Sequence, residues 1–382
     1  MDNRDKVIQT QLEVIGSLIN NNIRRMSDDF WGAPQNKAKP ESPSSKDGAP
    51  ASGKDPAKAA EQRCSTPQQD EAIPPKEDIA DLRKELHELI GLSGVKKEVD
   101  NLINIATVHS LRKQHNLKNV DLSLHMVFSG NPGTGKTMIA RLMARIYHSL
   151  DILSKGHLVE VDRSGLVAGY VGQTATKTSE VIQRAMGGVL FIDEAYALTG
   201  KAENDFGQEA VDTLLKAMED NREDLVVIVA GYDGLMDTFI HSNPGLESRF
   251  NRYLHFDDYS AEEMLSILEL QLKKGQYVLT EEARQAAAAY IQDANTSSIA
   301  FGNARGVRNI FERLLAAQAN RLAASQAVTR EDLMQITRED VLRARAEDPK
   351  LRARAEAEEE LRRAEQEAIA RIEQTYNETS PS

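Results

Sequence analysis

A glycine-rich segment, GNPGTGKT at 130–137, restricts the fold of this chain more than any other feature. It satisfies the pattern G-x-x-x-x-G-K-[ST], directly follows an apolar stretch at 126–129 and opens an amphipathic stretch at 136–149. Between a strand and a helix the pattern is specific, because the glycines let the backbone wrap around phosphates and the helix N-terminus adds amide donors. The segment predicts a nucleotide site in which Lys136 reaches the β- and γ-phosphates and the Thr137 hydroxyl ligates Mg²⁺.

The surrounding sequence alternates short apolar runs with amphipathic stretches. Strands are predicted at 126–130, 157–161, 189–193, 225–231 and 253–256, with helices at 136–149, 174–186 and 207–220. This alternation indicates an α/β fold with a parallel sheet covered on both faces. After Tyr259 the pattern is wholly helical, which predicts a small helical second unit.

A pair of adjacent carboxylates follows the third apolar run, in GVLFIDEA at 188–195. A buried strand that ends in an acid delivers it to the carboxyl edge of the sheet, where ligands of α/β folds bind. Asp193 suits the magnesium shell, and Glu194 suits deprotonation of an attacking water.

Three further patterns have both a functional and a structural interpretation. In ESRFNR at 247–252, two arginines three apart serve either a neighbouring subunit's site or the surface. Arg305 and Arg308, at the start of a helix after Gly302, either fold onto bound nucleotide or form a structural ion pair. The loop at 162–174 carries Tyr170, Val171 and Gly172, either as a grip on an unfolded polypeptide or as packed core.

Composition excludes several classes of protein. No segment approaches the roughly 20 apolar residues that cross a bilayer, and the start lacks the apolar stretch of a secretory signal, so we expect a cytoplasmic protein without a membrane partner. The single cysteine, Cys64, cannot form an internal disulfide. A net charge of -12 makes nucleic acid an unlikely partner, because phosphate binding needs clustered positive charge.

Both ends of the chain differ from the body. Apolar residues at steps of three and four predict an amphipathic helix over 7–26, which either self-associates or packs on the body, or else recruits a substrate or partner. Residues 32–76 carry most of the chain's 12 prolines and predict a disordered linker. The last segment, 343–382, predicts a charged helix, either solvated with i,i+4 ion pairs or in a weak coiled coil, and Pro349 either interrupts or starts it.

Taken together, the motifs GNPGTGKT, GYVGQT, GGVLFIDEAY, SNPGLESRFNRYLHF and FGNARGVRN resemble those of the AAA+ ATPases of the CbxX/CfxQ group. That group includes red-type Rubisco activase, stage V sporulation protein K-like ATPases and ATPases of mycobacterial type VII secretion. The resemblance covers about Leu89 to Asp340, and its motifs are specific as a set. It implies a hexameric ring that binds ATP between subunits and pulls on or remodels a protein client.

The resemblance also implies residue roles. Arg249, with Arg252 beside it, matches the arginine-finger positions, and Arg305 the sensor-2 arginine. Tyr170, Val171 and Gly172 become the loop that lines a central pore. The implied nucleotide-binding set comprises Ile90 and Gly91 near adenine, together with Asn131, Pro132, Gly133, Thr134, Gly135, Lys136, Thr137 and Met138.

One position departs from the pattern. Many AAA+ proteins carry Asn or Thr at the end of the strand before the finger, to position the attacking water, whereas this chain has Tyr232 there. Its hydroxyl is the candidate for that role.

The expected organisation is an AAA+ P-loop ATPase core and a small all-helical lid between helical extensions. Its segments are 1–31 (helix), 32–76 (linker), 77–258 (large α/β subdomain), 259–342 (lid) and 343–382 (charged helix). The expected function is an ATP-dependent, homo-hexameric protein-remodelling motor. The rivals are a Rubisco activase that releases inhibitory sugar phosphates, a nucleotide-gated scaffold without threading activity, and a DNA-acting machine, which the net charge disfavours.

Overall fold

The computed structural model describes residues 74–118, 123–170, 172–200, 206–325 and 327–379. The expected helix at 7–26 and most of the expected linker, with Cys64, lie outside the described residues, as does Val171. Among the described helices, none combines the length and apolar content that a bilayer crossing requires.

Five parallel strands form the central sheet, in the order β2-β3-β4-β1-β5. Strand β1 lies between β4 and β5, so that Met126 pairs with both Ile228 and Arg252. The strands are β1 (Met126–Gly130), β2 (Leu158–Val161), β3 (Val189–Ile192), β4 (Val226–Gly231) and β5 (Arg252–Phe256).

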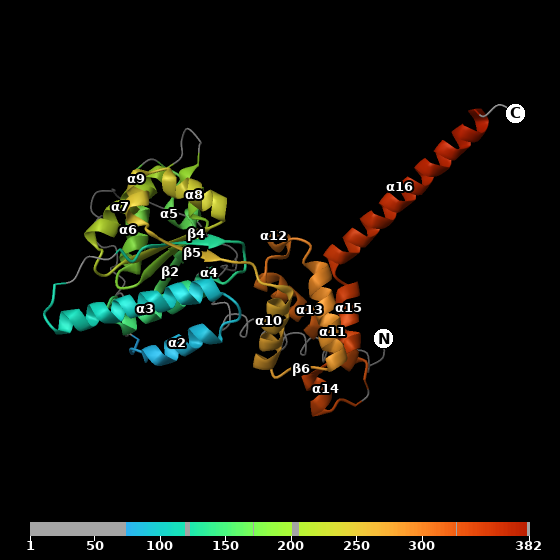
Figure 1. The fold of residues 1–382 in the computed structure, drawn as a ribbon, viewed down its shortest axis with the longest axis horizontal. Helices are drawn as coiled ribbons and strands as arrows, with labels where there is room; N and C mark the ends of the chain where they lie inside the picture. The colour runs from blue at the N-terminus through green and yellow to red at the C-terminus, as the bar shows by residue number, and fades with distance from the viewer. Residues whose placement is uncertain (1–73, 119–122, 171, 201–205, 326, 380–382) are drawn as a thin grey trace, which may run out of the picture.

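Two hydrophobic cores cover the two faces of this sheet. Successive strand residues point to opposite faces, so Ile228 and Ala230 join one core while Val227 and Val229 join the other. The first core is covered by α2 (Ile79–Glu88), α3 (Ser93–Gln114) and α4 (Lys136–Ser149). The second is covered by α6 (Thr174–Ala185), η1 (Ala195–Thr199), α7 (Gly207–Asp220), α8 (Asp233–His241) and α9 (Pro244–Arg249), and the short α5 (Arg163–Leu166) contacts α6 (Figure 1).

A second unit, mainly helical, follows β5 and lies beside the sheet domain (Figure 1). Its main helices are α10 (Ala261–Lys274), α11 (Glu281–Ala294), α13 (Ala304–Ala323) and α15 (Arg338–Ala346), and its short ones α12 (Ser298–Phe301) and α14 (Arg330–Met334). Strands β6 (Val278–Leu279) and β7 (Gln335–Ile336) form a two-stranded parallel ladder inside it. The helical pattern did not predict this ladder, since two residues are too few to show alternation.

The fold class is as the sequence predicts, with an α/β sheet domain followed by a helical unit. The predicted elements at 126–130, 136–149 and 207–220 match β1, α4 and α7, and the other predicted strands and helices of the sheet domain differ by one residue at an end. The helix predicted over 343–382 is divided, because α15 ends at Ala346 and α16 begins at Pro349. The expected boundary at 342–343 falls inside α15.

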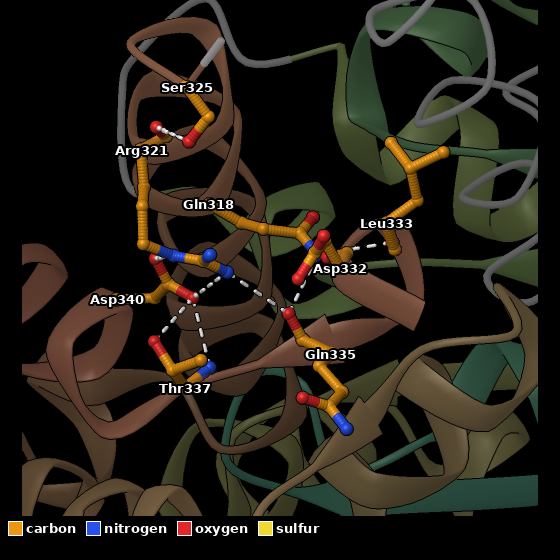
Figure 2. A network of polar contacts seen from close by, with 8 residues as sticks. All are labelled: Gln318, Arg321, Ser325, Asp332, Leu333, Gln335, Thr337 and Asp340. Atoms are coloured by element: carbon orange, nitrogen blue, oxygen red, sulfur yellow. Dashed lines mark hydrogen bonds and ion pairs between the residues drawn. The ribbon is translucent and has the colours of Figure 1, made fainter. Parts of the chain in front are cut away.

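A buried polar network fixes the far end of this second unit (Figure 2). Asp340 is 1% exposed and accepts hydrogen bonds from Arg321 at 2.8 and 3.0 Å and from the Thr337 backbone at 2.9 Å. The Gln318 amide donates to the carbonyls of Asp332, Leu333 and Gln335. These contacts join α13 to the ladder and to α15.

The C-terminal helix α16 (Pro349–Thr379) leaves the body as a long projection (Figure 1). Pro349 starts this helix, where its missing N–H is not needed. Asp348, directly before it, is 2% exposed, accepts from Lys350 N at 2.9 Å and from Tyr290 OH at 2.8 Å, and pairs with Arg313. Beyond this anchor, Arg354–Glu358 and Glu359–Arg363 form i,i+4 pairs on the solvated surface.

His125, just before β1, is buried and neutral. Its Nδ1 accepts a hydrogen bond from Val227 N at 3.0 Å, and its ring packs edge-on against Phe250. Burial lowers the pKa of His125 to about 4, a hydrogen bond with the Met218 backbone opposes this shift, and the charge of Arg249 adds to it.

We expect stability to depend on this histidine below pH 6.5. The unfolded chain takes up the proton near pH 6.5 but the folded chain only near pH 4, so up to about 3 kcal/mol of stability is lost as the pH falls through this interval. His125→Asn keeps an acceptor for Val227 N and cannot titrate. In urea unfolding series between pH 7 and 4, the variant should lose less stability than the wild type. Parallel pH profiles for the two proteins would contradict this assignment.

Candidate functional site

A cavity of about 300 Å³ opens at the carboxyl edge of the sheet, where the second unit meets it. The ends of four strands and the first turns of α4 and α13 converge there. It is lined by Gly130, Pro132, Gly133, Gly135, Lys136, Thr137, Met138, Glu160, Asp193, Glu194, Gly231, Tyr232, Arg305 and Arg308.

The segment 130–137 curls around one side of this cavity. Gly130, Gly133 and Gly135 all have positive φ, at 141°, 73° and 98°. A Cβ on Gly130 would lie 2.4 Å from the Phe256 carbonyl oxygen, so only glycine fits there. Gly135 is also the N-cap of α4, so the first turn of this helix faces the cavity.

Lys136 is held by the loop itself, since its Nζ donates to the carbonyls of Gly130 at 2.7 Å and Asn131 at 2.9 Å. Burial lowers the pKa of Lys136. The carboxylates of Asp193, Asp233 and Asp258 counteract that shift, while Arg305 adds to it. A cation surrounded by acids and held by two carbonyls is suited to exchange those partners for phosphate oxygens.

The acidic pair lines the same cavity as this lysine and follows the fully buried strand β3. Asp193 Oδ1 accepts from the Glu194 backbone N at 3.0 Å. Glu194 has left-handed backbone angles, φ 49° and ψ 41°, which are uncommon for a residue other than glycine. This conformation occurs where the chain turns from β3 into η1, and both carboxylates line the cavity.

Tyr232, at the end of β4, also lines the cavity. Its ring lies 6.1 Å from that of Tyr196, centroid to centroid. Next to it, Asp233 Oδ1 lies 2.9 Å from His255 Nδ1, which joins the start of α8 to β5.

The second unit contributes two arginines, Arg305 and Arg308, from the first turns of α13. Arg308 pairs with Glu312 at 3.1 Å. The helix reaches the loop directly, because Ala304 N donates to the Gly133 carbonyl at 3.2 Å.

Arg249 and Arg252 are not among the described residues that line this cavity. Arg249, at the end of α9, pairs with Glu219 of α7 at 3.2 Å and has 28% of its side chain exposed. Arg252 Nε donates to the Ser123 carbonyl at 3.1 Å, and Ser123 Oγ donates to the Arg249 carbonyl at 2.7 Å. Both arginines therefore lie away from the cavity of their own chain.

Tyr170 is 74% exposed, so the core interpretation of this tyrosine is wrong. Gly172 beyond it has φ 77° and open space around its Cα. A second cavity, of about 450 Å³, is lined by Gly169 and by Glu194 among others. The base of the Tyr170 loop therefore lies next to the acidic pair.

In the segment expected near adenine, Gly91 lies against Tyr259 and Glu263 at the start of the second unit. Neither Ile90 nor Gly91 is among the described residues lining the first cavity, and neither are Asn131 and Thr134. A Cβ on Gly91 would lie 2.7 Å from Glu263 Oε1 and 3.0 Å from the Tyr259 ring.

The site fits a nucleoside triphosphate. Three glycines give the backbone room to approach phosphates, a lysine and two arginines supply positive charge, and a hydroxyl and a carboxylate, on Thr137 and Asp193, are ligand types that Mg²⁺ prefers. Such a metal would be held by those two residues and would neutralise phosphate charge.

Two lining residues were missed from the sequence. Glu160 of β2 faces the cavity and pairs with Arg141 of α4 at 3.1 Å. Its signal was a single acid inside the apolar run HLVEV. Gly231 is the second, and it too has no room for a side chain, since a Cβ there would lie 2.8 Å from the Tyr196 ring.

Comparisons with known proteins agree with this architecture. Residues 126–258 match the model of the ATPase family associated with various cellular activities (AAA), and residues 260–353 match the AAA lid domain. The chain is therefore an AAA ATPase with its lid.

Individual relatives indicate which family of AAA ATPases the chain resembles. Stage V sporulation protein K of Bacillus subtilis (strain 168) is 42% identical over 246 residues, which cover 64% of this chain and 76% of that protein. Protein CbbX of Cereibacter sphaeroides is 48% identical over 62% of this chain and 76% of its own length. The chloroplastic ribulose bisphosphate carboxylase/oxygenase activase of Cyanidioschyzon merolae is 47% identical over 62% and 80%.

The chain belongs to the CbxX/CfxQ family of AAA ATPases. Among solved structures, a mutant of RuvB from Thermotoga maritima aligns at 20% identity with a TM-score of 0.46, covering 68% of this chain and 71% of that one.

Proposed function

We propose that this ATPase is a cytoplasmic, homo-hexameric motor that remodels a protein client. The proposal rests on where the structure places the candidate functional residues. Lys136, Glu194 and Arg305 share one cavity, whereas Arg249 is turned away from it and Tyr170 is exposed beyond it. A site completed by a neighbouring copy accounts for that arrangement.

Within one subunit, the proposed roles follow from position. Lys136 leaves the Gly130 and Asn131 carbonyls to bind phosphate oxygens, and the glycine turns bring backbone amides to the same oxygens. Thr137 and Asp193 would hold Mg²⁺. Glu194 accepts the proton of the attacking water, Tyr232 orients that water, and Arg305 binds phosphate from the lid.

Between subunits, Arg249 is the proposed finger, with Arg252 beside it. The ion pair of Arg249 with Glu219 is partly solvated, and exposed pairs contribute only about 0–1 kcal/mol. A triphosphate on the neighbouring subunit offers stronger, bidentate partners, so Arg249 can exchange Glu219 for them.

The Tyr170 loop is the proposed client grip. Its base lines the second cavity together with Glu194. A change in the nucleotide bound beside Glu194 can therefore reach the loop over a short distance. An aromatic side chain exposed beside glycines supplies apolar contact to an extended polypeptide without sequence preference.

A second candidate function is that of a Rubisco activase. It is favoured by the relative of Cyanidioschyzon merolae that bears that name. Both proposals share the ATPase cycle and differ in the client, and the net charge of -12 argues against nucleic acid for either.

Glu194→Gln should bind ATP but turn it over at least about 100-fold more slowly, because a general base typically contributes 10²–10⁴-fold. Phosphate release and a titration with a fluorescent ATP analogue measure the two properties separately. The control is Glu180→Gln, an exposed acid on α6. Near wild-type phosphate release by Glu194→Gln would assign the proton transfer to another group.

Arg249→Ala should bind ATP yet lose hydrolysis by about 10³-fold or more, the scale of an arginine finger. A mixing experiment tests whether the finger acts on a neighbour. Subunits with Glu194→Gln keep Arg249 and subunits with Arg249→Ala keep Glu194, so mixed rings should recover activity that neither variant has alone. Absence of recovery, in mixtures shown to co-assemble, would place Arg249 outside the neighbour's site.

Tyr170→Ala should lose the stimulation of ATP hydrolysis by an unfolded polypeptide, because the loop loses its apolar contact. Reduced, carboxymethylated lactalbumin is a suitable probe, and Tyr170→Phe, which keeps the ring, is the matched control. The ratio of stimulated to basal turnover is the measured quantity. Equal ratios in the wild type and Tyr170→Ala would exclude the grip, and no stimulation of any form would favour a nucleotide-gated scaffold.

A further inference from the structure

The junction between the phosphate loop and the lid is closed by an interlocked set of hydrogen bonds that the catalytic roles above do not use. Asn303, at the N-cap of α13, is fully buried. Its amide nitrogen donates to the Pro132 carbonyl at 3.2 Å and to Asp258 Oδ1 at 2.8 Å. Its amide oxygen accepts from Tyr259 N at 3.0 Å. One side chain of the lid thus binds both the loop and the segment that joins the two domains.

Asp258 completes the junction from the segment between β5 and α10. Its two carboxylate oxygens accept from the Asn131 amide at 3.0 and 2.9 Å, while Oδ1 also accepts from Asn303. The adjacent Tyr259 hydroxyl donates to the Thr134 carbonyl at 3.2 Å. Two residues of the interdomain segment are therefore bound to two residues of the phosphate loop.

The backbones at this point are as close as glycine allows. A Cβ on Gly133 would lie 2.2 Å from the Gly302 carbonyl oxygen, and Ala304 N donates to the Gly133 carbonyl. Asn303 itself has φ 50° and ψ −128°, a conformation rarely adopted by residues other than glycine. A strained backbone persists only where its surroundings over-determine it, and here the three side-chain bonds of Asn303 do so.

We propose that Asn303 and Asp258 are positioning residues that fasten the phosphate loop to the lid. We name the set Asn131, Asp258, Tyr259 and Asn303 the loop–lid clasp. It holds residues 131–134 against the first turn of α13 and so fixes the point at which the lid meets the sheet domain. The lid then turns about the clasp, and a phosphate bound in the loop acts on the lid through this joint as well as through Arg305.

The inference deepens the proposed function, because it rests on phosphates binding in the 130–137 loop. It has a consequence that Arg305 alone does not. Loosening the clasp should weaken the binding of ADP as well as ATP, because the lid no longer holds the loop in the conformation that binds phosphates.

The first experiment introduces charge repulsion across the clasp in the full-length chain. Asn303→Asp keeps the side-chain shape and the acceptor for Tyr259 N, but places a carboxylate against Asp258. We expect ADP affinity, measured with a fluorescent ADP analogue, to fall about tenfold or more, the scale of one or two buried hydrogen bonds. Asp258→Asn in the same chain turns the repulsion into a hydrogen bond and should restore most of the affinity.

The matched control is Asp340→Asn, which removes a buried ion pair at the far end of the lid. It should lower the unfolding midpoint and leave ADP affinity close to that of the wild type. If Asn303→Asp alone does not fold, Asp258→Asn alone tests the same contact, because the amides of Asn131 and Asn303 then compete for one acceptor. Wild-type affinity in the folded single variants, or no restoration in the double variant, would overturn the clasp.

The second experiment measures lid orientation itself. Spin labels at Lys216→Cys on α7 and Ala289→Cys on α11, both exposed positions, report the distance between the sheet domain and the lid. Cys64→Ser removes the native thiol, and an excess of unlabelled chain suppresses distances between subunits. We expect ADP and a non-hydrolysable ATP analogue to give distinct, narrow distance distributions in the wild type. In Asn303→Asp both should broaden and coincide.

The two proposals fail in different ways. If the wild type binds no nucleotide, the proposed function falls. If it binds nucleotide and Asn303→Asp gives the same two distance distributions as the wild type, the clasp falls and the ATPase remains.

Discussion

The parallel pairing of β1 with β4 on one side and β5 on the other is the constraint on which the rest of the structure depends. Parallel strands end at one edge of a sheet, so the phosphate loop after β1, Tyr232 after β4 and the interdomain segment after β5 are brought together there. The acids after β3 reach the same edge through β4. The cavity follows from strand order, and the lid covers it because its chain leaves from β5.

Local sequence predicted the elements and the cavity lining on the large subdomain well. The strands were visible as apolar runs, and the loop, Lys136, Asp193 and Glu194 follow from short motifs. Contacts between distant segments were not predictable. Arg249 meets Glu219, 30 positions away, and Asn303 meets Asp258, 45 positions away. Nothing in the sequence around either residue specifies its partner. The first contact forms only when α7 and α9 pack on the sheet, and the second only when the lid packs against the sheet domain.

Charge around the phosphate loop is balanced before any ligand arrives. Lys136 is half-buried near Asp193, Asp233 and Asp258, with Arg305 also close, so opposite charges offset part of the cost of removing its ammonium group from water. Phosphate binding would then replace the two carbonyl partners that the lysine already has. The acidity of the chain thus coexists with a local site for a highly charged anion.

The anchoring of α16 gives the lid a long reach. Asp348 is bonded to Tyr290 and Arg313 in the lid core, so the helix must follow the lid as a rigid extension. At 1.5 Å per residue, its 31 residues span about 46 Å. A lid rotation of about 10° would carry the tip through about 8 Å, from the same helix length. A small angular change at the nucleotide would thus become, at the end of this helix, a displacement comparable with the distance of about 8–10 Å between the axes of two packed helices.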